Sequence, residues 1–145
     1  MRIQTLRELL RSSGARPRHE ALLLRAWLRG LAPDTWAHKP ESAFPRSLLA
    51  ALPAISAELA ALGCVHSGHA GADDSERLLV QLADGQTVET VLLPPAGVCV
   101  STQVGCAVGC LFCMTGREGL LRQLGSAEIV AQFALARARR SVRRV

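Results

Sequence analysis

Three cysteines within eight residues constrain this chain more than any other feature of its sequence. They form a CxxxCxxC pattern at Cys106, Cys110 and Cys113. Three thiolates at this spacing can bind three irons of a [4Fe–4S] cluster and leave the fourth iron open for chemistry. Gly105 and Gly109 allow the backbone to fold tightly around the sulfurs. Phe112 is expected to shield one side of the cluster from water.

The cysteine spacing alone leaves other sites open. A zinc site needs a fourth ligand, which Cys99, His66 or His69 could supply. A closed ferredoxin site needs a fourth cysteine nearby, and three unliganded cysteines in a reduced protein are the remaining possibility. The spacing favours an open iron–sulfur cluster over these alternatives.

The segments that flank the cysteines favour a barrel-type unit. Val98 to Ser101 predicts a short apolar strand before them, and Ser126 can cap a helix after them, with Glu128 in its first turn. Strand, ligand loop and helix in this order are the first βα unit of a barrel. A second strand would be expected to begin where the sequence ends, at Val145.

The N-terminal residues 1–62 predict a helical module. Thr5 can cap a first helix that ends at Gly14, and Pro17 suits the first turn of a second helix that ends near Gly30 and carries Trp27 in its core. A polar loop with Pro33, Pro40 and Pro45 follows. A third helix, from Ser47 to Leu62, is expected to be interrupted or kinked at Pro53.

The central segment 63–97 predicts a loop followed by a β-hairpin. Residues 63–76 are rich in glycine and polar residues, so His66 and His69 are expected to be solvated there, and Cys64 reads as a small buried residue. Alternating apolar residues on both sides of Asp84-Gly85 predict a hairpin over 77–93. The sequence thus predicts an α+β part followed by an α/β part, divided at residues 1–62, 63–97 and 98–145.

The segment from Cys99 through Gly116 closely resembles the radical S-adenosylmethionine (SAM) RNA methyltransferases, which methylate C2 or C8 of an adenine in ribosomal or transfer RNA. The resemblance continues through Gly119 to Ile129, and upstream over Gly85 to Pro94. It implies a partial TIM barrel, a [4Fe–4S] cluster held by Cys106, Cys110 and Cys113, and SAM as a second cofactor.

The resemblance also implies roles for two further residues. Cys99 matches a cysteine that resolves a covalent enzyme–RNA adduct and is left in a disulfide, and Glu89 matches an acid/base residue. Without the resemblance, Cys99 would be interpreted as a small buried residue and Glu89 as a residue on the solvent-facing side of a strand. The family's methyl-carrying cysteine has no match after Cys113, so an N-terminal portion that is inactive alone is expected.

Arginine accounts for all but one of the seventeen basic residues, and the net charge is +5. Residues 1–29 and residues 96–145 each hold seven Arg against two Glu. Such ends are compatible with an RNA partner, although an arginine-rich coding bias would give the same composition.

No apolar run is long enough for a membrane span, so a cytoplasmic protein is expected. The resemblance implies an electron donor for the cluster, and we expect a monomer. A different radical SAM enzyme, and a small Fe–S or zinc module, remain alternative functions.

Overall fold

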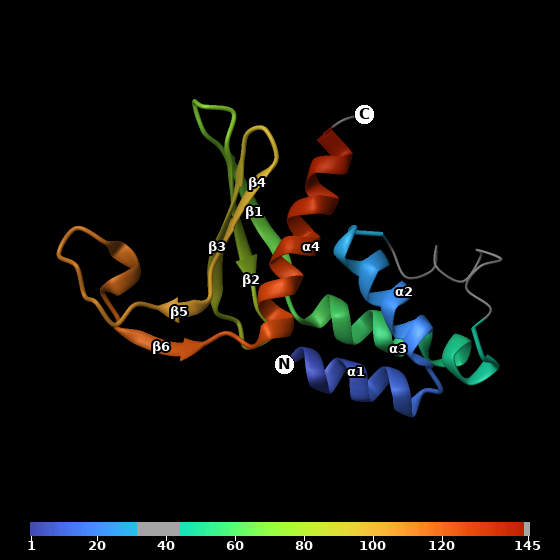
Figure 1. Cartoon of the computed structure of the whole chain (residues 1–145). Coiled ribbons are helices and arrows are strands. Elements are labelled where there is room, and N and C mark those ends of the chain that lie inside the picture. Colours follow the sequence, from blue (N-terminus) through green and yellow to red (C-terminus); the bar gives the residue numbers. More distant parts are fainter. Residues whose placement is uncertain (32–43, 144–145) are drawn as a thin grey trace.

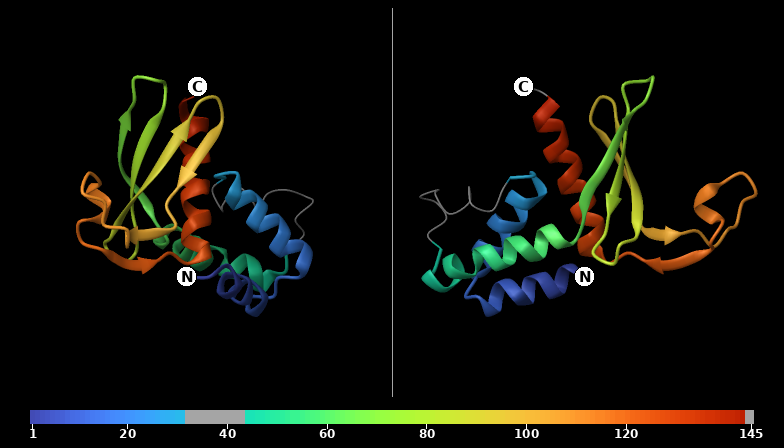
Figure 2. Two further views of the ribbon diagram at one scale, coloured as in Figure 1. Left: turned by 60° about the vertical axis from the view of Figure 1, so that its left-hand side comes forward. Right: turned by 180° about the vertical axis from the view of Figure 1, so that it is seen from behind.

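A helical module and an antiparallel sheet lie on opposite sides of one long helix (Figures 1 and 2). The computed structural model describes residues 1–31 and 44–143, the side chains of 141–143 excepted. The predicted loop prolines Pro33 and Pro40 lie outside this range. The module contains α1 (Ile3–Ser12), α2 (Pro17–Leu28) and α3 (Arg46–Ala61), and the long helix is α4 (Ser126–Arg143).

The helical interpretation of the N-terminal segment is confirmed for its described residues. Gly14 ends α1 with a φ of +90°, a backbone conformation that favours glycine, and Pro17 opens α2. Two details were wrong. Helix α1 begins at Ile3 without a side-chain cap, so Thr5 lies inside it, and α3 continues through Pro53 without interruption.

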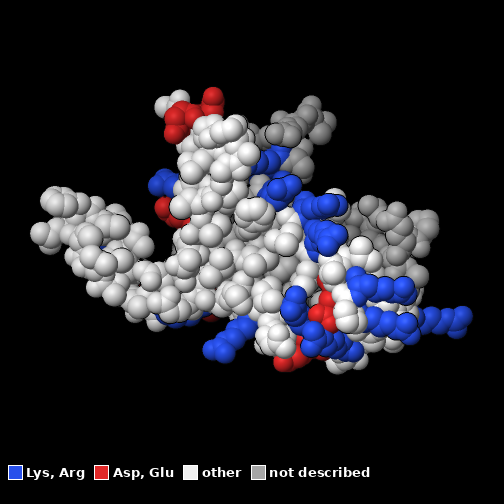
Figure 3. Space-filling model, viewed as in Figure 1, with Lys and Arg blue, Asp and Glu red and all other residues white. Residues whose placement is uncertain are grey.

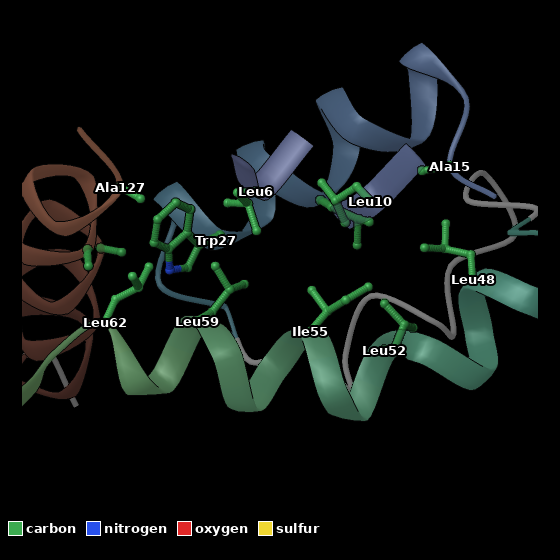
Figure 4. Packing of buried hydrophobic residues seen from close by; sticks show 13 residues of the cluster. Leu6, Leu10, Ala15, Trp27, Leu48, Leu52, Ile55, Leu59, Leu62 and Ala127 are labelled. Atoms are coloured by element: carbon green, nitrogen blue, oxygen red, sulfur yellow. The ribbon is translucent and has the colours of Figure 1, made fainter. Parts of the chain in front are cut away.

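Leucine and isoleucine side chains form the core of the module. Figure 4 shows Ile55 and Leu59 of α3 pointing toward Leu6 of α1 and Trp27 of α2. Each of these four side chains is buried. With so few aromatic residues, packing of aliphatic side chains supplies most of the module's hydrophobic stabilisation.

The sheet has four antiparallel strands in the order β1-β2-β3-β4. They are β1 (Cys64–Ala70), β2 (Glu76–Gln81), β3 (Thr87–Leu93) and β4 (Gly97–Val100). The predicted hairpin is confirmed as β2 and β3, and Gly85 in its turn has a φ of +81°. The residue types at the turn therefore set the register of these two central strands.

The sequence interpretation was wrong at the β1 edge of the sheet and confirmed for the strand at the β4 edge. Residues 64–70 were expected in a loop but form β1, which pairs with β2, and Cys64 is exposed where burial was expected. Backbone hydrogen bonds to a neighbouring strand can hold a polar, glycine-containing segment that has no strong strand pattern of its own. The strand expected before the cysteines is β4, which pairs antiparallel with β3.

The loop cysteines lie between the two strands of a second sheet that the sequence did not predict. Strands β5 (Gln103–Gly105) and β6 (Leu120–Gln123) pair antiparallel and carry the cysteine-containing loop, residues 106–119, at their far end. This ribbon projects from the rest of the molecule (Figure 1). A barrel with this unit at its start remains a proposal.

Helix α4 joins the two halves through its opposite sides. Ala127, Ala131 and Ala134 pack into the core of the module, while Ala136 and Ile129 pack against the sheet. The small alanines let α4 approach the module closely. None of the described helices has the length and apolarity that crossing a bilayer requires.

A buried glutamine fastens α4 to the sheet. The Oε1 atom of Gln132 accepts hydrogen bonds from Thr90 Oγ1 and from the Ser101 backbone N–H, both at 2.9 Å. Its Nε2 atom donates to the Ser101 carbonyl oxygen, also at 2.9 Å. Gln132 and Thr90 are fully buried, so these bonds replace water that the groups have lost.

We expect Gln132→Ala to lower the free energy of unfolding by about 2 to 3 kcal/mol, because it leaves a buried hydroxyl and a partly buried backbone N–H without their partner. Urea unfolding followed by circular dichroism measures this change. Gln123→Ala, at an exposed position on β6, is the matched control and should change stability by less than about 0.5 kcal/mol. Equal stability of the two variants would contradict the account.

Candidate functional site

The cysteine-containing loop is closed at its base by two glycines. Cys106 N–H donates to the Gly119 carbonyl oxygen at 3.0 Å. Gly105 has a φ of +74°, and a Cβ there would collide with that same oxygen. Glycine is therefore required at this position, because both the conformation and the close approach exclude a side chain.

The loop also folds back on itself near its tip. Gly109 has a φ of +62°, and the buried Gly116 lies so close to it that an added Cβ would be 3.2 Å from the Gly109 Cα. The Cys113 N–H donates to the Cys110 carbonyl oxygen at 3.1 Å. The two glycines thus bring the segment after the last cysteine back beside the segment between the first two.

All five cysteines carry free thiols. Within the loop, Cys106 is half-buried, whereas Cys110 and Cys113 are exposed. Hydrogen bonding by the Thr115 side chain and backbone lowers the pKa of the Cys113 thiol, and the nearby charge of Glu89 acts in the opposite direction. A lowered pKa favours the thiolate, which is the form that binds metals.

The thiols of the three loop cysteines are chemically suited to bind an iron–sulfur cluster. Three thiols on one glycine-rich loop are soft ligands for iron, and no carboxylate or imidazole lies between them in the sequence. In the described part of the chain, no group of three or more His, Cys, Asp and Glu side chains is gathered closely enough to hold a single metal ion. The three thiols would therefore have to converge around a larger group when it binds.

The zinc alternative finds no support in this arrangement. His66 and His69 lie on β1 and Cys99 on β4, at opposite edges of the four-stranded sheet. Among the described residues they form no ligand group with the loop cysteines.

Large apolar side chains surround the loop cysteines and face solvent. Phe112 and Leu111 are fully exposed, and Val108 and Met114 are mostly exposed. Phe112 belongs to neither of the two apolar cores of the described residues. Its expected role in shielding a cluster from water stays a prediction.

A cleft of about 560 Å³ lies between the ribbon and the face of the sheet that is turned away from α4. Its lining mixes apolar residues with polar ones, among them Thr87, Glu89, Ser101, Thr115 and Arg117. Glu89 forms an exposed ion pair with Arg77 at 3.5 Å, and its carbonyl oxygen accepts a hydrogen bond from Ser101 Oγ at 2.7 Å. The carboxylate that the sequence singled out therefore lies in a cleft with the end of the cysteine-containing loop.

Cys99 shares the outer face of the sheet with Glu89 but does not line the cleft. Cys99 is exposed and pairs with Val91, two residues along β3 from Glu89. Diagonal neighbours of this kind on one face are about 7 to 8 Å apart, within reach of the same bound molecule.

Arg122 on β6 anchors the ribbon, and the sequence analysis missed it. Its guanidinium donates to Asp84 Oδ2 at 2.7 Å and to both Glu128 oxygens, at 2.8 and 3.2 Å. Glu128 also accepts from the Gly125 N–H at 2.7 Å and pairs with the Met1 ammonium at 3.5 Å. Glu128 could be noticed in the sequence as an acid in the first turn of a predicted helix. Nothing in the sequence indicated that Arg122 would contact it and also Asp84, which lies 38 residues earlier.

Proteins named as probable RNA methyltransferases match this chain over its whole length. The protein of Aromatoleum aromaticum is 66% identical, that of Thiobacillus denitrificans 61% and that of Leptothrix cholodnii 57%. The chain is a homologue of these proteins. It spans about two fifths of their length, 41%, 40% and 42% respectively. No family model matches it.

We expect the Arg122 junction to make stability depend on pH. Hydrogen bonding by Arg122 lowers the pKa of Asp84 below its ordinary 3.8. Burial raises the pKa of Glu128, but Arg122 and the Gly125 N–H outweigh it and bring it below its ordinary 4.5. Carboxyls with lowered pKa values stabilise the fold above their unfolded-state pKa, and this contribution is lost as pH falls through the folded-state value.

Wild-type stability should therefore fall as pH drops below about 5. Arg122→Gln should be less stable at neutral pH and lose less on acidification, as measured by urea unfolding across this range. Arg77→Gln, which removes an exposed ion pair, should retain the wild-type pH profile. Parallel profiles for wild type and Arg122→Gln would contradict the role of the junction.

Proposed function

We propose that this chain is part of a radical SAM RNA methyltransferase that transfers a methyl group to C2 or C8 of an adenine in ribosomal or transfer RNA. One observation carries the proposal: three free cysteines lie on a loop whose far end borders a cleft that contains Glu89. The names of the full-length homologues support RNA methylation, and the motif supports the radical SAM chemistry.

Cys106, Cys110 and Cys113 would hold a [4Fe–4S] cluster, with SAM at the open iron. When bound there, these cofactors supply the one-electron chemistry that activates a methyl group. The chain's own contribution is to place the thiols: the glycines shape the loop, Thr115 favours the Cys113 thiolate, and Arg122 fixes the ribbon to the sheet.

Glu89 and Cys99 would act on the RNA after the methyl carbon has joined the base. The carboxylate of Glu89 is exposed in the cleft and can accept the proton that the ring loses as it regains aromaticity. The thiol of Cys99 lies on the same face and is free to attack the covalent adduct. In that attack the Cys99 sulfur would bond to the sulfur of the methyl-carrying cysteine, which lies outside this chain. The bond between that sulfur and the carbon on the base would break, and this carbon would take the electron pair and a proton to become the methyl group. A reductant must then open the disulfide.

The cleft is where we place the target base. Chemistry on a base requires that it leave the RNA stack, and the cleft's mixed lining and volume suit an extruded nucleotide. The remaining strands of a partial TIM barrel would cover the exposed apolar side chains of the loop. The whole enzyme would work as a cytoplasmic monomer supplied by an electron donor.

The cluster assignment predicts that anaerobic reconstitution gives about four irons and four sulfides per chain. Cys110→Ala should lose cluster binding, because it removes one of only three protein ligands. Iron and sulfide analysis with electron paramagnetic resonance (EPR) measures the product. The matched control is Cys64→Ala, an exposed cysteine on β1, which should bind the cluster like the wild type. Stoichiometric zinc without cluster uptake would overturn the assignment.

The proposed function predicts that the chain supports methylation when it is joined to the remaining part of a full-length homologue. We expect a chimera, with residues 1–145 in place of the matching part of the Aromatoleum aromaticum protein, to methylate an adenine in RNA. Nuclease digestion and mass spectrometry identify the product. In this chimera Cys99→Ala should trap a covalent enzyme–RNA adduct, whereas Cys64→Ala should turn over normally.

Normal turnover by the Cys99→Ala chimera would refute the role of Cys99. A chimera that cleaves SAM but methylates no adenine would favour a radical SAM enzyme with another substrate. A chimera that binds a cluster but does not cleave SAM would favour a small electron-transfer module.

A further inference from the structure

Arginines from two distant parts of the sequence meet on one side of the molecule. Arg18, Arg25 and Arg29 lie on the exposed side of α2, and Arg137 lies on the exposed side of α4; we call these four the arginine face. Figure 3 shows Lys and Arg side chains spread over α4, α2 and α1, whereas the visible surface of the ribbon is almost free of charge.

The contact between α2 and α4 brings the two groups together. Gly30, directly after Arg29, lies so close to α4 that an added Cβ would be 2.7 Å from the Ala138 nitrogen. Arg29 directly precedes Gly30 and Arg137 directly precedes Ala138, so this contact brings the two arginines close together. The spacing of Arg18, Arg25 and Arg29, seven and then four residues, keeps all three on one side of α2.

Among the residues that the structure describes, no acidic side chain neutralises the arginine face. Arg11 pairs with Glu20, Arg139 with Glu76, and Arg122 with Asp84 and Glu128. By contrast, Arg25, Arg29 and Arg137 form no ion pair or side-chain hydrogen bond with any residue in the described ranges, and all three are exposed. Arg18 donates only to the ring of the neighbouring His19.

The helix dipole explains only part of this arrangement. The carbonyl end of a helix favours cations, and Arg25 and Arg29 lie at that end of α2, whereas Arg137 lies before the last turn of α4. A favourable dipole does not use the guanidinium N–H groups, which have no partner among the described residues in Arg25, Arg29 and Arg137. A planar guanidinium binds a phosphate through two parallel hydrogen bonds, and several on one surface suit a polyphosphate backbone.

We propose that the arginine face binds the phosphodiester backbone of the RNA substrate, apart from the cleft that receives the base. The proposal rests on the proposed function for the identity of the nucleic acid. Phosphate contacts position a nucleic acid whereas base contacts select the target, so the two can lie on different surfaces. A stem beside the target adenine would lie along α2 and the end of α4.

Fluorescence anisotropy of the 145-residue chain with a fluorescein-labelled RNA hairpin tests this surface, at KCl from about 50 to about 200 mM. The logarithm of the wild-type affinity should fall linearly with the logarithm of salt concentration. Replacing Arg25, Arg29 and Arg137 together by Gln should reduce the magnitude of that slope by about 2 to 3, since each lost contact accounts for about 0.7 to 0.9.

A matched pair of single variants locates the effect. Arg29→Gln should weaken binding more than Arg46→Gln, because Arg46 lies at the start of α3 and Leu59 and Ala60 near its end line a pocket with Gly30 and Ala138. The two ends of this 16-residue helix are about 24 Å apart. Urea unfolding of each variant separates lost contacts from lost folding.

An unchanged salt slope in the triple variant, or equal losses in Arg29→Gln and Arg46→Gln, would overturn the proposal. Equally tight binding of phosphatidylglycerol vesicles would reject RNA as the preferred occupant. Absence of RNA binding at low salt would also overturn it, while cluster assembly and methylation by the chimera would still report on the proposed function separately.

Discussion

The guanidinium of Arg122 determines where the cysteine-containing loop lies. It is held by Asp84 in the β2–β3 turn and by Glu128 in the first turn of α4, with the Met1 ammonium on the same carboxylate. Because Glu128 is buried, removing Arg122 would leave its charge with only the Met1 ammonium at 3.5 Å and the Gly125 N–H, which is costly. Four segments therefore meet at one junction, and the ribbon's position over the sheet depends on it.

This junction connects the fold to the proposed chemistry. Gln132 fixes α4 to β3 and to the segment after β4, and Arg122 fixes β6 to α4 and the hairpin turn. Both sides of the cleft are thus attached to the same helix. The position of the ribbon relative to Glu89 depends on these two side chains and on the packing of Val104 and Leu124 in the core of the sheet. The loop itself contributes free thiols and exposed apolar surface, which suits a part that is completed by a cofactor and by further chain.

The sequence predicted elements whose cause is local. Asp84-Gly85 fixed a hairpin, Gly14 and Pro17 separated two helices, and Ser126 marked the beginning of α4, because turn and cap residues act over a few positions. Features that depend on distant partners were missed. Strand β1 exists because β2 offers an edge to it, and the antiparallel pairing of β4 with β3 could not be read from the short strand that the sequence predicted. The candidate cysteines and Glu89 could be chosen from the sequence, but the Arg122 junction joins residues 38 and 6 positions apart and needed the structure.

The central claim is that the three loop cysteines hold a cluster with one iron open to SAM, beside the cleft that contains Glu89. EPR spectroscopy of the reduced, reconstituted chain before and after addition of SAM tests it most directly. The account predicts a cluster signal whose g values change when SAM is added, with no such signal in Cys106→Ala, Cys110→Ala or Cys113→Ala. A signal that SAM leaves unchanged, or one that survives the loss of any of these cysteines, would contradict it.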